Sequence, residues 1–305
     1  MPNSLPKPRI AAIVVTRNRL ALLQECLDAL HSQSRAVDEI FVINNASNDG
    51  TREFLDSQSD LTAIHQGNLG GAGGFHRGIK AAYGAGHDWF WLMDDDTIPH
   101  PDALKKLCAA PGFKTGSAGY LSSIVRWTDG QLHKMNMVGS HTAGGMSWYD
   151  SVLHDKCIPS EVSTFVSILV SRRAVAEVGL PLKEFFIWSD DVEYTHRISR
   201  QFPCFCVLDS VSVHKTPANK DGDPSQIAPG DVWKLRYGLR NQVAFLRRQP
   251  GLSLRPLRVA YFMARQVYFV AKGRLPLGAK LGLLRRLGSG LWFNPQIERV
   301  APDNS

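Results

Sequence analysis

Short apolar runs that alternate with helix-like stretches are the feature that most restricts the fold of this chain. The run Ile10–Thr16 lacks the alternation of polar and apolar residues that marks a half-exposed strand, so we predict a strand buried on both faces of a sheet. Similar runs occupy Glu39–Asn44, Leu61–His65 and Trp89–Met93. The pattern predicts βαβ units around a parallel sheet, and the fold class is therefore α/β.

The stretches between these runs have apolar residues at helical spacing. The helices predicted for the first half are Leu20–Gln33, Thr51–Ser57, Phe75–Gly84 and Pro99–Ala109. For the second half we predict strands at Val162–Ser171, Cys204–Leu208 and Val211–His214, and helices at Ala174–Gly179 and Val192–Arg200. Residues 116–160 lack a clear period and are expected to form strands and substrate-facing loops, and residues 219–230 a mobile loop or linker.

The net charge of +7 is distributed unevenly over the 305 residues. Residues 1–231 carry 21 basic and 26 acidic side chains, whereas residues 232–305 carry 14 basic and 2 acidic ones. We therefore predict two domains, 1–231 and 232–305, of which the second is a basic tail. The five cysteines form no CxxC pair and the first residues have no apolar signal core, so a reducing, cytoplasmic location is expected.

Three consecutive acids, Asp94, Asp95 and Asp96, follow the run Trp89–Met93. Ligands bind at the carboxyl ends of strands in open α/β sheets, and two carboxylates one residue apart can hold a hard divalent cation there. A solvated turn or the N-cap of the next helix could use the same residues. His214 ends another predicted strand, and its imidazole suits a metal such as Mn²⁺, although a single histidine is more often structural.

A glycine-rich segment, Asn68–Gly74, precedes a predicted helix. Glycines let the backbone approach a ligand closely, and a helix that begins near Phe75 would offer free N–H groups to an anion. The spacing fits neither a dinucleotide-binding fingerprint nor a Walker A loop. Its place just before the strand that carries the acidic triplet favours a ligand-binding loop over a merely flexible one.

A second acidic cluster, Ser189–Glu193, contains Asp190 and Asp191 and follows aromatic residues. A carboxylate in a partly apolar pocket is a suitable general base for a sugar hydroxyl, because burial and a neighbouring acid raise its proton affinity. The same acids also suit the first turn of the predicted helix, where they interact with its dipole. The two roles are compatible.

Seven motifs occur in order between residues 9 and 245: VVTRNR, VINNASNDGT, NLGGAGGFHRG, WLMDDDT, FFIWSDDVEY, VSVHK and RYGLRN. Together they resemble the nucleotide-sugar-dependent glycosyltransferases of family 2, and most of all their branch of galactofuranosyltransferases and rhamnosyltransferases. The resemblance implies a GT-A fold with a Rossmann-like central mixed sheet, here followed by a C-terminal basic helical region. It also implies an inverting, metal-dependent enzyme that acts on a glycan or glycolipid acceptor. UDP-galactofuranose is the favoured donor, and dTDP-rhamnose is the alternative.

The resemblance also implies roles for single residues. Donor contacts are implied for Thr16, Arg17, Arg19, Asn44, Asn45, Asn68, Gly70, Gly71 and Asp95. The implied ligands of Mn²⁺ or Mg²⁺ are Asp94, Asp96 and His214, and the implied source of the catalytic base is the pair Asp190 and Asp191, with Asp191 preferred. Arg17 stands where relatives often have an aromatic residue, and Asn44 where many have Asp, so the recognition of the base departs from the family pattern.

The basic tail has the pattern of an amphipathic helix. Within residues 256–272, Arg258, Arg265 and Lys272 recur every seven residues and share one face. No stretch is apolar enough to span a bilayer, so we expect the tail to lie on an anionic membrane surface, at the inner face of the bacterial cytoplasmic membrane. The alternative is a helical appendage that packs on the body or on the second subunit of a homo-oligomer.

A non-enzymatic glycan- or nucleic-acid-binding protein is the alternative from another functional class. Nucleic-acid binding through the tail would require a recognisable fold or stacking motif, and the tail has none, so no specific nucleic-acid partner is expected. An inactive glycan-binding homologue is disfavoured, because both acidic clusters and His214 are present.

Overall fold

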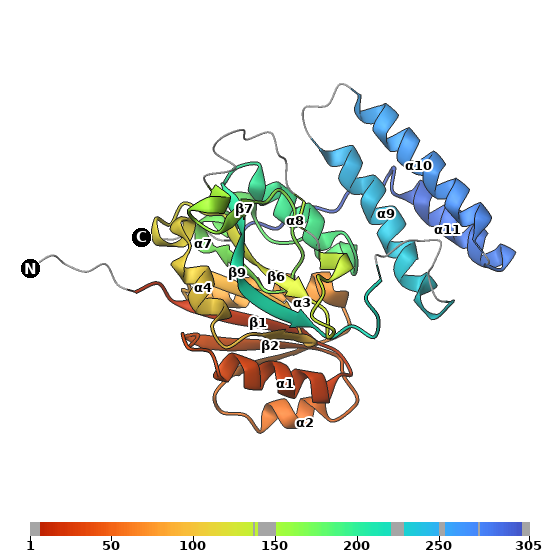
Figure 1. The fold of residues 1–305 in the computed structure, drawn as a ribbon. Helices are drawn as coiled ribbons and strands as arrows, with labels where there is room; N and C mark the ends of the chain where they lie inside the picture. The colour runs from red at the N-terminus through yellow and green to blue at the C-terminus, as the bar shows by residue number, and fades with distance from the viewer. Residues whose placement is uncertain are drawn as a thin grey trace, which may run out of the picture.

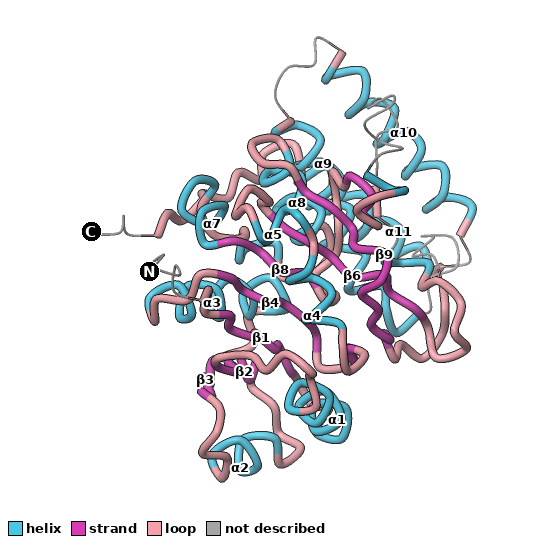
Figure 2. Tube along the Cα trace, turned by 60° about the vertical axis from the view of Figure 1, so that its left-hand side comes forward, coloured by secondary structure: helices cyan, strands magenta, loops and turns pink. Residues whose placement is uncertain are grey.

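The computed structural model describes residues 7–136, 138–139, 151–220, 229–249, 254–273 and 275–300. The strands of these residues form one nine-stranded sheet in the order β3-β2-β1-β4-β8-β6-β9-β5, and β7 (Cys157–Pro159) also pairs with β9. Figure 2 shows the sheet running through the body, with helices on its outside. Three C-terminal helices stand beside this body in Figure 1.

The N-terminal half of the sheet is parallel, as the apolar runs predict. Its strands are β1 (Ile10–Thr16), β2 (Glu39–Asn45), β3 (Thr62–Gln66) and β4 (Trp89–Asp94). The helices between them are α1 (Leu20–His31), α2 (Thr51–Asp56) and α3 (Gly70–Gly84). Every residue of β1 is buried, because the strand lies in the middle of the sheet between β2 and β4.

The other half of the sheet is mixed. β8 (Ile168–Ser171) is antiparallel to β4 and to β6 (Tyr120–Arg126), β9 (Cys204–His214) is parallel to β6, and β5 (Thr97–Pro99) is antiparallel to β9. The helices of this half are α4 (Ala103–Ala109), α5 (Pro111–Lys114), α7 (Arg172–Val178) and α8 (Asp190–Ser199). The α/β mixed sheet expected from the sequence is confirmed.

Several predicted boundaries were wrong. The strand predicted at Val162–Ser171 is only β8, and the two strands predicted between residues 204 and 214 are one continuous β9. The ladder between β6 and β9 shifts register after Ser123, and this irregularity accommodates the polar Asp209 and Ser210 that divide the apolar pattern. Most of the predicted linker at residues 219–230 lies outside the described residues.

The tail consists of α9 (Val232–Arg248), α10 (Arg255–Lys272) and α11 (Leu277–Ser289). These helices share an apolar cluster of their own, with α10 on the side away from the body in Figure 1. The segment after α11 returns to the body, where the backbone O of Glu298 accepts a hydrogen bond from Leu180 N at 2.9 Å. No described helix combines the length and the apolar character needed to cross a bilayer. The division into two domains stays a prediction.

Candidate active site

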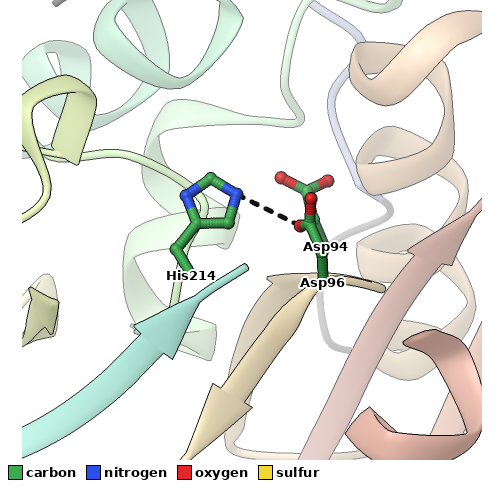
Figure 3. Close-up of side chains that lie close together, drawn as sticks. All are labelled: Asp94, Asp96 and His214. Atoms are coloured by element: carbon green, nitrogen blue, oxygen red, sulfur yellow. Dashed lines mark ion pairs between the residues drawn. The ribbon is translucent and has the colours of Figure 1, made fainter. Parts of the chain in front are cut away.

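Two acids of the triplet and His214 converge at the ends of three strands. Asp94 is the last residue of β4, Asp96 lies between β4 and β5, and His214 ends β9, where it pairs with Thr97. One potential ligand atom from each of the three residues lies within 4.8 Å of the others. Figure 3 shows the imidazole pointing at the two carboxylates. The antiparallel pairing of β5 with β9 thus brings together residues more than a hundred positions apart.

The atoms of this group are arranged to receive a cation. His214 Nδ1 lies 2.8 Å from Asn136 Oδ1, and Asn136 Nδ2 donates to Thr164 Oγ1 at 2.8 Å. In the neutral imidazole this leaves the Nε2 lone pair facing Asp96 Oδ1 at 3.1 Å. That carboxylate oxygen is buried and has no hydrogen-bond partner among the described residues. A divalent ion held by Asp94, Asp96 and His214 would give both acceptor atoms a partner.

Arg19 and the middle acid of the triplet form a second network. The Arg19 guanidinium lies 3.2 Å from Asp95 Oδ1 and 2.5 Å from Asp96 Oδ2. Asp95 Oδ2 also accepts hydrogen bonds from the Thr16 hydroxyl at 2.9 Å and from Arg17 N at 3.3 Å. Asp95 therefore ties the loop after β1 to the end of β4, and it does not belong to the group formed by Asp94, Asp96 and His214.

Burial and mutual repulsion separate the acidities of the triplet. Burial, together with the charge of Asp96, raises the pKa of Asp94 well above its usual range. Burial also raises the pKa of Asp95 to about 6, although the charge of Arg19 opposes this. Burial acts in the same direction on Asp96, but a protonated His214 that donates to it, together with the charge of Arg19, outweighs burial and lowers that pKa. A bound cation would favour the ionised forms of Asp94 and Asp96.

A cleft of about 320 Å³ opens beside the triplet. Its lining contains Asp94 and all but one of the residues for which donor contacts are expected: Thr16, Arg17, Arg19, Asn45, Asn68, Gly70, Gly71 and Asp95. Asn44 does not line this cleft, because its side chain contacts His65 Nδ1 and accepts a hydrogen bond from Ser47 N. The tail helix α9 adds Trp233 and Lys234, for which the sequence gave no specific signal.

The glycine-rich segment is not a loop that ends before a helix at Phe75; α3 begins at Gly70. The positive φ of 71° at Gly70 suits a residue without a side chain, and a Cβ there would lie 2.0 Å from the carbonyl oxygen of Phe186. Asn45 Nδ2 donates to Gly70 O at 2.8 Å, and Gly70 N donates to Asn68 Oδ1 at 3.1 Å. These contacts turn the first glycines of α3 toward the cleft.

A cavity of about 330 Å³ adjoins the cleft, with which it shares Arg17, Asn68, Phe186 and Trp233. Its remaining lining residues come from the tail: Arg236, Tyr237 and Arg286. Among the described residues, no carboxylate lines this cavity, and the guanidinium groups of Arg17, Arg236 and Arg286 make its lining basic. Such groups favour phosphate-bearing ligands.

Asp190 and Asp191 form the first turn of α8, so the predicted helix start at Val192 was two residues late. Burial and the charge of Asp191 raise the pKa of Asp190 to about 8, and burial raises the pKa of Asp191 to about 6. The carboxyl of Asp190 interacts electrostatically with Asp94, whereas Asp191 lines a separate cavity of about 530 Å³. One acid of the pair therefore acts on the group formed by Asp94, Asp96 and His214, and the other lines a second cavity.

The segment before α8 is held by the tail. Phe186, Trp188 and Ser189 all have a positive φ, between 66° and 67°, which is unfavourable for residues with side chains. Asn241 of α9 is fully buried, and its Nδ2 donates to the carbonyl oxygens of Phe185 at 2.8 Å and Trp188 at 2.8 Å. The tail therefore stabilises the backbone that places the acid pair.

Known proteins resemble this chain in sequence. A model of glycosyl transferase family 2 matches residues 11–149. Galactofuranosyltransferase GlfT1 of Mycolicibacterium smegmatis is 29% identical over 92% of this chain and 96% of its own length. A similar relative, GlfT1 of Mycobacterium tuberculosis, is 28% identical over 92% of this chain and 95% of its own length.

Solved structures share the fold. S. aureus TarS 1–349 in complex with UDP has a TM-score of 0.61 at 13% identity and covers 93% of this chain and 80% of its own. The mannosyltransferase PcManGT of Pyrobaculum calidifontis, in complex with GDP-Man and Mn²⁺, has a TM-score of 0.55 at 18% identity, covering 94% of this chain and 88% of its own. The architecture is thus the GT-A fold, with additional C-terminal helices.

Proposed function

We propose that this chain, whose residues 11–149 match a model of glycosyl transferase family 2, transfers galactofuranose from UDP-galactofuranose to a hydroxyl group of a glycan acceptor, with inversion. The observation that carries the proposal is the grouping of Asp94, Asp96 and His214, of which Asp94 lines the cleft and has its pKa raised further by the charge of Asp190. The choice of galactofuranose rests on the similarity to GlfT1 along almost the whole chain.

The metal group fits Mn²⁺ or Mg²⁺, with Asp94, Asp96 and His214 as its ligands. Carboxylate oxygens suit both ions, and the imidazole makes Mn²⁺ the better match. When bound, such an ion neutralises negative charge on the diphosphate leaving group. Arg19 adds positive charge at the same place, because its guanidinium already contacts Asp95 and Asp96.

Asp191 is the proposed general base. Its carboxylate accepts the proton of the acceptor hydroxyl as that oxygen forms a bond to the anomeric carbon of the donor. The bond from this carbon to the diphosphate oxygen breaks, and UDP leaves with the electron pair. A pKa near 6 keeps Asp191 mostly ionised at neutral pH, yet more basic than an exposed carboxylate. Asp190, the other acid of the pair, has the higher pKa and is the one whose charge acts on Asp94.

A donor screen tests the proposed sugar. The purified protein with Mn²⁺ would be incubated with UDP-galactofuranose, dTDP-rhamnose and UDP-hexopyranoses, and thermal stabilisation and sugar release or transfer would be recorded. We expect the largest response with UDP-galactofuranose. A clear preference for dTDP-rhamnose would move the assignment to a rhamnosyltransferase of the same fold.

We also propose that the tail holds the enzyme on an anionic membrane surface, where a glycolipid acceptor would be met. The outer side of α10 and α11 exposes large apolar side chains, among them Leu257, Tyr261, Tyr268, Leu277 and Leu281. Exposed Arg258, Arg265 and Lys272 lie on the same helix α10. Apolar and basic side chains on one helix suit the interface of an anionic bilayer.

Flotation with liposomes tests the membrane proposal. We expect binding to vesicles that contain phosphatidylglycerol, weaker binding at high salt, and a loss when Tyr261 and Tyr268 are both replaced by Ser. If the protein does not bind anionic vesicles at low salt, the membrane proposal is wrong. The tail then packs on the body or on a second subunit, and the molar mass in solution distinguishes these two cases.

A further inference from the structure

A further cavity, of about 490 Å³, lies between helix α8 and the end of α9. It shares no lining residue with the donor cleft, with the basic cavity beside that cleft or with the cavity at Asp191. Helix α8 contributes Glu193, His196, Arg197 and Arg200. The end of α9 and the C-terminal segment contribute Phe245, Arg248, Gln249 and Ile297. The proposed chemistry uses none of these residues.

The one carboxylate among the described residues that line this cavity is already neutralised. Glu193 is buried, and it accepts hydrogen bonds from Arg197 Nε at 3.0 Å and from Arg197 Nη2 at 2.9 Å. The same guanidinium also donates to the carbonyl oxygens of Val178 and Leu180. Glu193 and Arg197 therefore form a closed pair, and neither neutralises another side chain in the cavity.

Two further guanidinium groups in the lining have no acidic partner in the part of the chain that the structure describes. Arg200 is exposed, and its guanidinium makes no hydrogen bond or ion pair with any described residue. Arg248 is half-buried, and its Nη1 donates only to the carbonyl oxygen of Pro295, at 2.7 Å. With three guanidinium groups and one carboxylate, the lining has an excess of two positive charges.

The acidities in the cavity reflect this excess. Burial and the charge of Arg200 lower the pKa of His196, although the charge of Glu161 opposes this. Burial also lowers the pKa of Arg248, and the charge of Glu193 does not outweigh it. An anion bound between these groups would favour their charged forms and would remove the repulsion between them.

The charge and the shape of the lining fit a phosphate group. Guanidinium groups bind phosphate through paired N–H donors, and a phosphomonoester carries about two negative charges at neutral pH, which matches the excess. The ring of Phe245 stands edge to face with His196 at 5.3 Å and offers apolar surface to an organic substituent. We propose that this cavity binds the phosphomonoester group of a small molecule or of a lipid headgroup, held by Arg200 and Arg248 between α8 and α9.

Calorimetric titration with inorganic phosphate, in the presence of EDTA, tests the site without donor or metal. The proposal is therefore judged independently of the proposed function. We expect Arg200→Gln to weaken the binding of phosphate to one site of the chain about tenfold, because it removes a charged hydrogen-bond donor. Arg52→Gln is the matched control, because Arg52 is exposed on α2 and does not line the cavity. Equal phosphate titrations for wild type and Arg200→Gln would overturn the proposal.

Thermal melting separates a phosphate ligand from a structural role of Arg200. Without phosphate, Arg200→Gln should melt at or slightly above the wild-type temperature, because it removes one of the repelling charges. Phosphate should then raise the melting temperature of the wild type and of Arg52→Gln more than that of Arg200→Gln. Chloride at the same ionic strength controls for screening. A marked loss of stability in Arg200→Gln, or equal stabilisation by phosphate and chloride, would contradict a phosphate site.

Flotation with vesicles identifies the source of the phosphate once the titration has shown the site. Phosphatidic acid presents a phosphomonoester at the membrane surface, whereas phosphatidylglycerol presents a phosphodiester. If Arg200→Gln binds phosphatidic acid vesicles more weakly than Arg52→Gln does, while both bind phosphatidylglycerol vesicles equally, the phosphate belongs to a lipid headgroup. If the two variants float equally with both kinds of vesicle, the ligand is a small phosphorylated molecule.

Discussion

Asn241 of helix α9 donates a hydrogen bond from Nδ2 to the carbonyl oxygen of Trp188 at 2.8 Å, just before the turn that carries the acid pair. The same amide donates to Phe185 and Ile187, so one side chain satisfies carbonyl groups of a strained segment. Gly238, one turn earlier in α9, leaves room for the Trp188 ring, since a Cβ there would approach it to 2.6 Å. The tail is therefore part of what places Asp191.

Asn241→Leu should impair both stability and catalysis. The substitution keeps the volume but leaves buried carbonyl oxygens unpaired, which costs about 1–3 kcal/mol of unfolding free energy. We expect a lower melting temperature and a reduced kcat, while the affinity for UDP with Mn²⁺ changes little. Asn294→Leu, at an exposed position after α11, serves as the control. If only stability falls and kcat per folded molecule is unchanged, Asn241 does not position the acid pair.

Asp191→Asn should abolish transfer while it preserves donor binding. The amide keeps the shape of the side chain but cannot accept the proton of the acceptor, and the loss of a general base costs about 100- to 10,000-fold in rate. Calorimetric titration with UDP and Mn²⁺ should give nearly the wild-type affinity. Asp209→Asn, at an exposed position of β9, should behave as the wild type. Near-normal turnover by Asp191→Asn would contradict the assignment.

Asp96→Ala and Asp94→Ala should remove the metal dependence of donor binding. Without either carboxylate the ion loses an anionic ligand, so addition of Mn²⁺ should no longer strengthen the binding of UDP. In the wild type, removal of the metal with EDTA should weaken UDP binding to the level of these variants. The exposed Asp102→Ala is a suitable control. UDP affinity that still rises with Mn²⁺ in both variants would place the metal elsewhere.

Asn136→Leu should lower the affinity for Mn²⁺, although Asn136 is not one of the expected metal ligands. Asn136 Oδ1 fixes the imidazole of His214 by contact with Nδ1, and loss of such a partner typically costs 10- to 100-fold in metal affinity. Mn²⁺ binding can be followed by its electron paramagnetic resonance signal. Asn136→Asp should retain more of the affinity than Asn136→Leu, because it keeps an acceptor oxygen at the same place. Equal affinities in all three proteins would show that His214 is held by other contacts.

The activity should depend on pH through Asp191. Burial raises its pKa to about 6, and only the ionised carboxylate can accept a proton. The value of kcat/KM should therefore fall as the pH decreases through about 6, and level off above about 7. Asp95 has a similar pKa, so the pH profile of the Asp95→Asn variant must be recorded as well. The kcat/KM of this variant should fall at the same pH as that of the wild type. A profile without this limb down to pH 5 would argue against Asp191 as the base.

The architecture of the body could be predicted from the sequence, because the signals for its strands lie within short stretches of the chain. Unalternated apolar runs are sufficient to identify central strands such as β1 and β4, and an acidic triplet at the end of such a strand marks the ligand-binding edge of the sheet. The resemblance carried by the seven motifs then predicted that His214 is a metal ligand together with Asp94 and Asp96. Its nearness to Asp96 follows from the pairing of β5 with β9, a long-range contact that no local pattern encodes.

Other features had no local signal. Asn136 lies in a stretch without periodicity, so nothing in the sequence marked it as a partner of His214. The glycines after Asn68 looked like a loop because glycine is a poor helix former, whereas packing against Phe186 lets α3 begin at Gly70. Gln266 sits in a helix that its basic residues marked as a surface element, and only the tertiary packing of α9 and α10 buries it.

The fit of α9 to the segment before Asp190 has a consequence for which parts of the chain can be exchanged. Because Asn241 and Gly238 are fitted to the segment before Asp190, a foreign tail joined after residue 231 would meet a mismatched turn. An exchange of the tail would therefore have to include residues 185–193, the segment that α9 contacts. The part of this protein that can be exchanged as a unit therefore includes both α9 and the segment before Asp190 that it contacts. It does not end at residue 231, where the distribution of charge suggests a domain boundary.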